Sequence, residues 1–140
     1  MRRIWKTADL FAMGGGTYAL LEVLWRGYTH WTMAVLGGAL FLSLGLLDTH
    51  LPAALPLPLR CCLGGGLITA SELAAGCVLN LGLGLSIWDY SALPFQLLGQ
   101  ICLPYSLLWV LLSALAMPLY SAMCRYGWQD AKKGADRPLS

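Results

Sequence analysis

The sequence predicts an all-α membrane protein with about four transmembrane helices. Of its 140 residues, 58% are hydrophobic and only 11% are charged, whereas an average soluble domain carries roughly 25% charged residues. The apolar residues also gather in long segments, each near the roughly 20 residues that a helix needs to cross a bilayer. We therefore expect a single four-helix transmembrane domain over residues 8–123, between a basic N-terminus at 1–7 and a polar tail at 124–140.

The residues between the apolar segments place the four expected helices. Pro52, Pro56 and Pro58 separate the second helix from the third, because proline fixes φ and lacks a backbone donor. An irregular stretch from Trp88 to Pro94 separates the third from the fourth, and Pro104 suits the first turn of the last helix. The helices are expected at about residues 8–25, 31–47, 61–87 and 101–123.

The distribution of Lys and Arg predicts that both termini face the cytoplasm, since basic residues near span ends collect on that side. The loop after the first span has only Arg26, and the loop after the third has none. We do not expect the N-terminus to be a removable signal peptide, because its apolar segment holds Glu22 and further spans follow. The tails carry the other basic residues of the argument, Arg2, Arg3, Lys6, Arg125, Lys132, Lys133 and Arg137.

A repeated pattern relates the first span to the third. Residues 14–16 are three glycines followed after five residues by Glu22, and residues 64–66 are three glycines followed after five residues by Glu72, an offset of 50. The pattern predicts two related helical hairpins in parallel orientation, with Glu22 equivalent to Glu72, as in transporters with internal repeats. The alternative is coincidence in a chain with 16 glycines.

The two intramembrane glutamates are the strongest candidates for a functional site. A carboxylate in a membrane span costs roughly 2.5 to 3.5 kcal/mol, so it normally faces protein or water. Helical spacing aligns Tyr18, Glu22, Arg26 and His30 on one stripe, and Thr69, Glu72, Gly76 and Asn80 on another. A structural alternative is that Glu22 only pairs with Arg26 one turn away. We expect Glu22, Arg26 and Glu72 to meet in the bundle interior.

Polar residues beside the spans extend this set, while motifs for other chemistries are absent. Interfacial anchoring explains the tryptophans and tyrosines near the span ends, but not the polar groups among them. The five cysteines lack metal-site spacing, and neither a phosphate-binding loop nor a nucleic-acid-binding pattern occurs, so we expect no metal, cofactor or nucleic acid. The substrate-binding candidates are Glu22, Arg26, His30, Glu72, Asn80, Asp89 and Gln100.

Two longer motifs carry a family resemblance. The first is Gly-Gly-x-Tyr-x-x-x-Glu-x-x-Trp-Arg-Gly-x-Thr-His-Trp at residues 15–31, and the second is Trp-Asp-Tyr-Ser-x-x-Pro-x-x-x-x-Gly-Gln-Ile-Cys at residues 88–102. Together they resemble small bacterial membrane proteins known as putative ABC-transporter type IV permeases. The resemblance implies a permease of the bacterial inner membrane, with a separate ATPase subunit as a possible partner.

Three functions remain open. The first is a transporter or transporter subunit that moves a small polar or cationic solute past Glu22 and Glu72. The second, less favoured, is an intramembrane enzyme that acts on a lipid or its head group through Arg26, His30, Asp89 and a glutamate. The third is an assembly subunit whose polar groups only hold helices together. Because about four spans enclose little space, we expect a homo-oligomer or a partner membrane subunit within the lipid bilayer.

Overall fold

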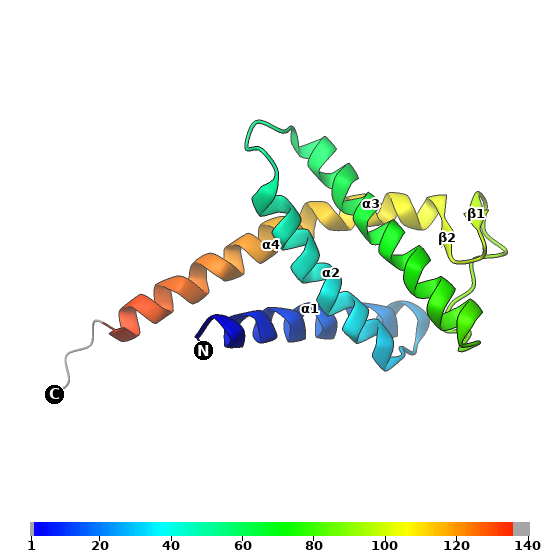
Figure 1. The fold of residues 1–140 in the computed structure, drawn as a ribbon, viewed down its shortest axis with the longest axis horizontal. Coiled ribbons are helices and arrows are strands. Elements are labelled where there is room, and N and C mark those ends of the chain that lie inside the picture. Colours follow the sequence, from blue (N-terminus) through cyan, green and yellow to red (C-terminus); the bar gives the residue numbers. More distant parts are fainter. Residues whose placement is uncertain (1, 136–140) are drawn as a thin grey trace. The chain divides into compact units, whose positions relative to one another are not determined.

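The computed structural model describes the backbone of residues 2–135 and the side chains of residues 6–126 (Figure 1). Its four α-helices confirm the predicted all-α fold. They are α1 (Arg2–Arg26), α2 (Trp31–His50), α3 (Leu57–Gly76) and α4 (Leu103–Ala135). Within the described residues, three segments are long and apolar enough to cross a membrane, at Trp31–His50, Leu57–Gly82 and Leu103–Tyr126.

The predicted first span coincides with α1, but α1 is less apolar than the other three helices. It carries Asp9, Glu22 and Arg26 together with the glycine triplet at residues 14–16. The helix therefore confirms the secondary structure expected there, while a membrane-spanning role for α1 stays a prediction. The basic side chains of the topology argument at positions 2, 3, 132, 133 and 137 lie outside the described side chains.

The chain forms two compact units, and the first combines residues up to Gly45 with the part of α4 from Ala116. Glycines let its helices approach closely, as expected for membrane helices. A Cβ on Gly15 would lie 2.3 Å from the carbonyl oxygen of Ala34, and a Cβ on Gly45 would lie 2.2 Å from the Tyr120 ring. These contacts hold α1 and the end of α4 against α2.

The second unit is Leu46–Leu115, and it begins with a short turn between α2 and α3. Arg60 Nη2 lies 2.8 Å from Asp48 Oδ1, and this ion pair bridges the turn. Pro56 caps α3 with extended backbone angles, and Pro58 occupies the first helical turn, where a missing N–H costs nothing. The proline-rich linker is thus shorter than predicted, because α3 begins at Leu57 rather than near Cys61.

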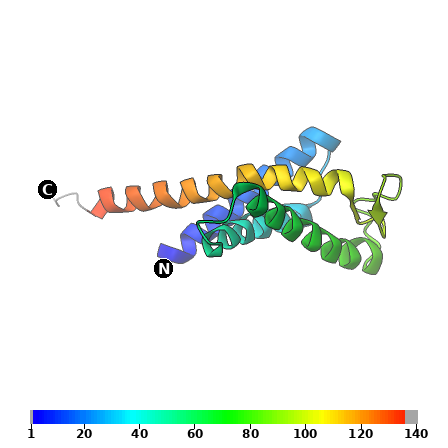
Figure 2. The same cartoon turned by 90° about the horizontal axis from the view of Figure 1, so that it is seen from above.

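Past Gly76 the third helix widens into a π-helix, η1 (Cys77–Gly82). A non-helical segment at residues 83–102, which we call the α3–α4 loop, then leads to α4. It contains a two-stranded antiparallel hairpin, β1 (Gln96–Leu97) and β2 (Ile101–Cys102), beside the first turn of α4 (Figure 2). The third span therefore ends at Gly82, five residues before the predicted end at Ile87.

The offset of 50 residues in the sequence repeat holds only in part. It relates residues of α1 to residues of α3, and both glycine triplets with their glutamates are helical. The residues equivalent to α2, 81–100, instead form the end of η1 and most of the α3–α4 loop. If the two hairpins are related, the second contains an insertion before α4. The expected polar tail is also helical as far as Ala135.

Candidate functional site

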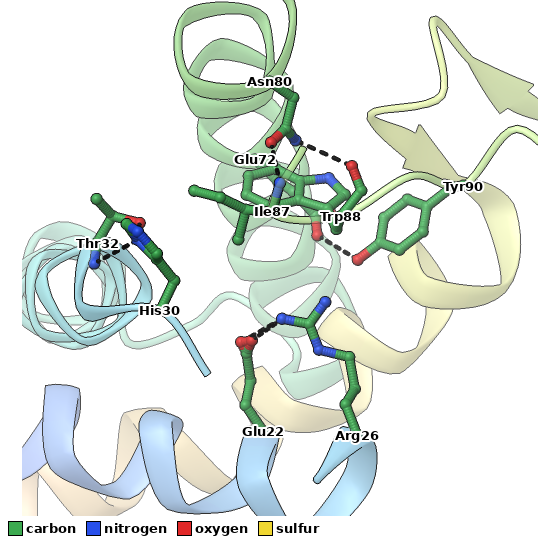
Figure 3. A network of polar contacts seen from close by, with 9 residues as sticks. All are labelled: Glu22, Arg26, His30, Thr32, Glu72, Asn80, Ile87, Trp88 and Tyr90. Atoms are coloured by element: carbon green, nitrogen blue, oxygen red, sulfur yellow. Dashed lines mark hydrogen bonds and ion pairs between the residues drawn. The ribbon is translucent and has the colours of Figure 1, made fainter. Parts of the chain in front are cut away.

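The carboxylate of Glu72 is the buried acidic group at the centre of the second unit. Its residue is only 4% exposed on the α3 side facing α4. Tyr90 Oη donates to Glu72 Oε1 at 2.9 Å, and Trp109 Nε1 donates to Glu72 Oε2 at 2.9 Å (Figure 3 draws the first bond). Each carboxylate oxygen therefore has a donor, one from the α3–α4 loop and one from α4.

The polar stripe predicted on the third span faces protein along its length. Thr69 Oγ1 donates to Ser106 Oγ on α4 at 3.2 Å, one turn from Glu72. On the other side of Glu72, Gly76 lies against Gln100, where an added Cβ would come within 2.4 Å of Gln100 Oε1. The absence of a side chain at Gly76 is what allows Gln100 to approach α3.

Asn80 ends the same stripe and organises the α3–α4 loop. Its Oδ1 accepts the backbone N–H of Ile87 at 2.7 Å, and its Nδ2 donates to the Trp88 carbonyl at 3.1 Å (Figure 3). Nδ2 also donates to Gln100 Oε1 at 2.8 Å, while Trp88 Nε1 donates to the Gln100 carbonyl at 3.0 Å. Asn80 and Gln100 are both at least nine-tenths buried. They connect the two ends of the loop to η1.

Aromatic rings surround the donors of Glu72. Tyr90 stacks on Tyr105 with ring centroids 4.8 Å apart and planes 9° from parallel. Tyr105 in turn packs against Trp109, with centroids 6.0 Å apart. These contacts fix the ring orientations, and so they position the phenol of Tyr90 and the indole N–H of Trp109 toward the carboxylate.

Glu22 and Arg26 form an ion pair within α1, in the first unit. Arg26 Nη2 lies 2.5 Å from Glu22 Oε1 and 3.2 Å from Oε2 (Figure 3). The guanidinium carbon also lies 4.8 Å from the centre of the Tyr28 ring. The pairing expected from their spacing is confirmed. The meeting of this pair with Glu72 stays a prediction based on the cost of burying charge.

His30 does not continue the stripe on α1, which corrects the expected alignment. The helix ends at Arg26 because Gly27 takes a φ of +83°, a left-handed conformation that glycine adopts easily. His30 instead precedes α2, and its Nδ1 accepts the Thr32 N–H at 3.3 Å and contacts Thr32 Oγ1 at 2.7 Å (Figure 3). A side-chain acceptor bonded to the second residue of a helix is an N-cap.

Asp89 is exposed and bonded within its own turn. Its Oδ1 accepts the Ser91 N–H at 2.9 Å and also the Ser91 hydroxyl. These two bonds, the hydroxyl bond first, lower the pKa of the Asp89 carboxyl below its ordinary value of 3.8. The arrangement orders the turn at residues 89–91. Gly99 makes it possible, since a Cβ there would lie 2.8 Å from Asp89 Oδ1.

Of the seven predicted site residues, the second unit bonds Asn80 to Gln100 and holds Glu72 eight residues before Asn80 on the same buried stripe. Sequence reasoning missed Tyr105 and Trp109 and gave Tyr90 only an interfacial role. One signal could have identified Trp109, because it falls well inside a span rather than at an end. An indole N–H in an apolar span requires an acceptor, and Glu72 is the carboxylate of the neighbouring helix.

The comparisons with known proteins identify one family. A family model described as "Putative ABC-transporter type IV" matches residues 17–135 of the chain. The match includes the second sequence motif and the first motif from Thr17 onward. It also includes Glu72, Tyr90, Tyr105 and Trp109, which we call the Glu72 cluster. No curated protein and no solved structure matches the chain.

Proposed function

Since the chain belongs to the putative ABC-transporter type IV family, we propose that it is a membrane transporter subunit whose solute site contains Glu72. The observation that carries this proposal is a glutamate, 4% exposed, in a segment apolar enough to span a membrane. Ionisable residues in such segments commonly mark the path of an ion or polar solute.

The chemistry of the Glu72 cluster favours a cationic or hydrogen-bond-donating solute. Carboxylate oxygens accept hydrogen bonds and attract positive charge. Trp109 donates from a helix, whereas Tyr90 donates from the α3–α4 loop. A solute donor can therefore replace the Tyr90 phenol without disturbing the packing of α3 against α4. Asn80 and Gln100 would act by holding the loop that carries Tyr90.

Glu22 and Arg26 are the second part of the proposed path. Their ion pair places a charged group on α1, and Arg26 could donate to two carboxylates through its planar fork. His30 and Asp89 belong to the proposal as groups beside the path. The contacts found for them, an N-cap and a turn, support local structural roles.

The proposal also includes a topology and partners. With both termini in the cytoplasm of a bacterial cell, the α2–α3 turn would lie on the same side as the tail, as the basic residues favour. Reporter fusions at Ala54 and after Ser140 should then both give a cytoplasmic signal. A second copy or another membrane subunit would complete the path, and an ATPase that co-purifies with the tagged chain would supply energy.

The test compares Glu72→Gln with the wild type in proteoliposomes. Uptake of K⁺, tetramethylammonium and ethidium is measured with ATP and any co-purified ATPase present, and without them. The amide keeps the size of the side chain but removes its charge, so uptake of the transported probe should be lost while the variant still inserts. Asp48→Asn is the matched control outside the cluster and should transport normally. If the folded Glu72→Gln variant takes up the probe at the wild-type rate, the proposed role of Glu72 is refuted.

An assembly subunit is the second candidate, and one observation favours it. Glu72, Asn80 and Gln100 all have hydrogen-bond partners within the unit, as expected if they only hold helices and loop together. This function predicts that the wild type moves none of the probes, and that Glu72→Gln changes stability alone.

A further inference from the structure

The tip of the α3–α4 loop, residues 93–98, is apolar and exposed, although it is not part of a helix. Phe95 is 82% exposed, Leu97 51% and Leu98 59%. Among residues 83–102 the sequence has a single charged residue, Asp89. Loops that face water usually carry polar side chains, and contiguous exposed apolar groups indicate a surface that meets another apolar phase.

The polar groups around this tip are bonded inside the loop. Leu97 and Ile101 are paired across the hairpin, and Gly99 N–H donates to Gln96 Oε1 at 2.7 Å. Gln100 Nε2 donates to the Leu98 carbonyl at 3.0 Å. Amide side chains of the loop therefore make the hydrogen bonds that water would make in a water-exposed loop. Non-helical backbone at membrane depth requires internal partners of this kind.

The apolar tip continues into the exposed face of a membrane-spanning helix. Leu103, the first residue of α4, donates its N–H to the Phe95 carbonyl at 3.3 Å. From Leu103 the exposed leucines recur every fourth residue along α4, at Leu107, Leu111 and Leu115. Residues four apart share one helix face, and this face belongs to a segment apolar enough to span a bilayer. Phe95 thus lies at the end of an apolar surface that lipid chains would cover.

We propose that the tip, residues 93–98, inserts into the bilayer at the boundary between lipid head groups and acyl chains. The phase that covers Phe95, Leu97 and Leu98 is then lipid hydrocarbon. Asp89, which is exposed and charged, stays at the level of the head groups and water. The loop that delivers Tyr90 to Glu72 is therefore anchored by lipid. This inference concerns the surface of the loop and does not depend on the proposed transport function.

A fluorescent label at the tip tests the insertion. Phe95→Cys is made in a background with Cys62→Ser and Cys124→Ser, labelled with bimane in detergent and reconstituted in phosphatidylcholine vesicles. The same background without Phe95→Cys measures labelling of the remaining cysteines. Nitroxide-labelled lipid with the nitroxide near the top of the acyl chain should remove most of the fluorescence of the tip label, whereas iodide in the water should remove little.

Ala54→Cys in the exposed α2–α3 turn is the matched control, and it should show the reverse order of quenching in vesicles opened to iodide on both sides. Leu98→Cys gives a second tip position if Phe95→Cys fails to fold. Strong quenching by iodide would place the tip in water and overturn the proposal. Protection from both quenchers would mean that protein covers the tip, and would overturn it equally.

Discussion

Tyr90 Oη lies 2.9 Å from Glu72 Oε1, so a residue of a non-helical loop donates a hydrogen bond to a carboxylate within a membrane span. The loop reaches this position because Asn80, in η1, bonds to Ile87 near the start of the loop and to Gln100 near its end. The order of the loop and the environment of the carboxylate are therefore linked. A substitution that disorders the loop should also change the environment of Glu72.

The first prediction concerns the phenol of Tyr90. Tyr90→Phe keeps the ring that stacks on Tyr105 but removes the donor to Glu72. Removing one partner of a buried hydrogen bond typically costs about 1 to 3 kcal/mol, so the free energy of unfolding should fall by about that amount. Denaturant or thermal unfolding in detergent measures the loss. Tyr28→Phe, at a tyrosine 61% exposed, should change stability little, and equal losses in both variants would contradict the prediction.

The second prediction uses two glycines of α3 that differ in their surroundings. Gly76→Ala would put a Cβ 2.4 Å from Gln100 Oε1 and 2.9 Å from its Cβ, so the buried Gln100 would have to move. Overpacking of this kind typically costs about 1 to 3 kcal/mol. Gly66→Ala meets nothing within 4 Å and should be neutral or slightly stabilising, since alanine favours a helix. Melting temperatures of the two variants test this difference in stability. Equal melting temperatures would mean that Gln100 is mobile and can move away from the added Cβ.

The third prediction concerns Asn80. Asn80→Leu removes the hydrogen bonds that Asn80 makes to the Ile87 N–H, the Trp88 carbonyl and the Gln100 amide oxygen. Hydrogen–deuterium exchange of the Ile87 amide should therefore become much faster. Asn80→Asp retains the acceptor for Ile87 but loses both Nδ2 donations, so it should protect this amide better than Leu. Unchanged exchange in Asn80→Leu would show that the loop does not depend on Asn80.

The helices could be predicted from the sequence because their signals are strong and local. Apolar runs of span length, the prolines before α3 and Pro104 at the start of α4 placed the starts of α2, α3 and α4 to within four residues. The Glu22–Arg26 pair followed from helical spacing alone. Likewise, an uncompensated carboxylate is so costly in a span that Glu72 had to face protein, and it does.

The α3–α4 loop could not be predicted in the same way. Its shape depends on bonds between residues far apart in sequence, such as Asn80 with Gln100, and no periodic pattern encodes these bonds. Three bulky or polar residues, Ser86, Phe95 and Leu98, also take positive φ angles that their residue types disfavour. The extension of the repeat through residues 81–100 does not match the secondary structure, because most of these residues lie in this loop.

The fourth prediction follows from the hydrogen bonds of Asp89. Because the Ser91 hydroxyl and then the Ser91 N–H hold its pKa below 3.8 in the folded protein, ionised Asp89 stabilises the fold above its unfolded pKa of about 3.9. That contribution is lost as the pH falls through the lower, folded pKa. Asp89→Asn should therefore lower the melting temperature at pH 7, and the difference from the wild type should shrink below about pH 4.

Ser91→Ala separates this effect from a general acid sensitivity. It removes the hydroxyl donor while keeping the backbone N–H bond, so the pKa of Asp89 should rise toward its ordinary value. The acid loss of stability should then be smaller and be complete at a higher pH than in the wild type, because the folded and unfolded pKa values of Asp89 lie closer together. Melting temperatures across the acid range measure the size of this loss for all three proteins. An equal acid loss of stability in Ser91→Ala and the wild type would mean that the hydroxyl does not hold the carboxylate in its charged form.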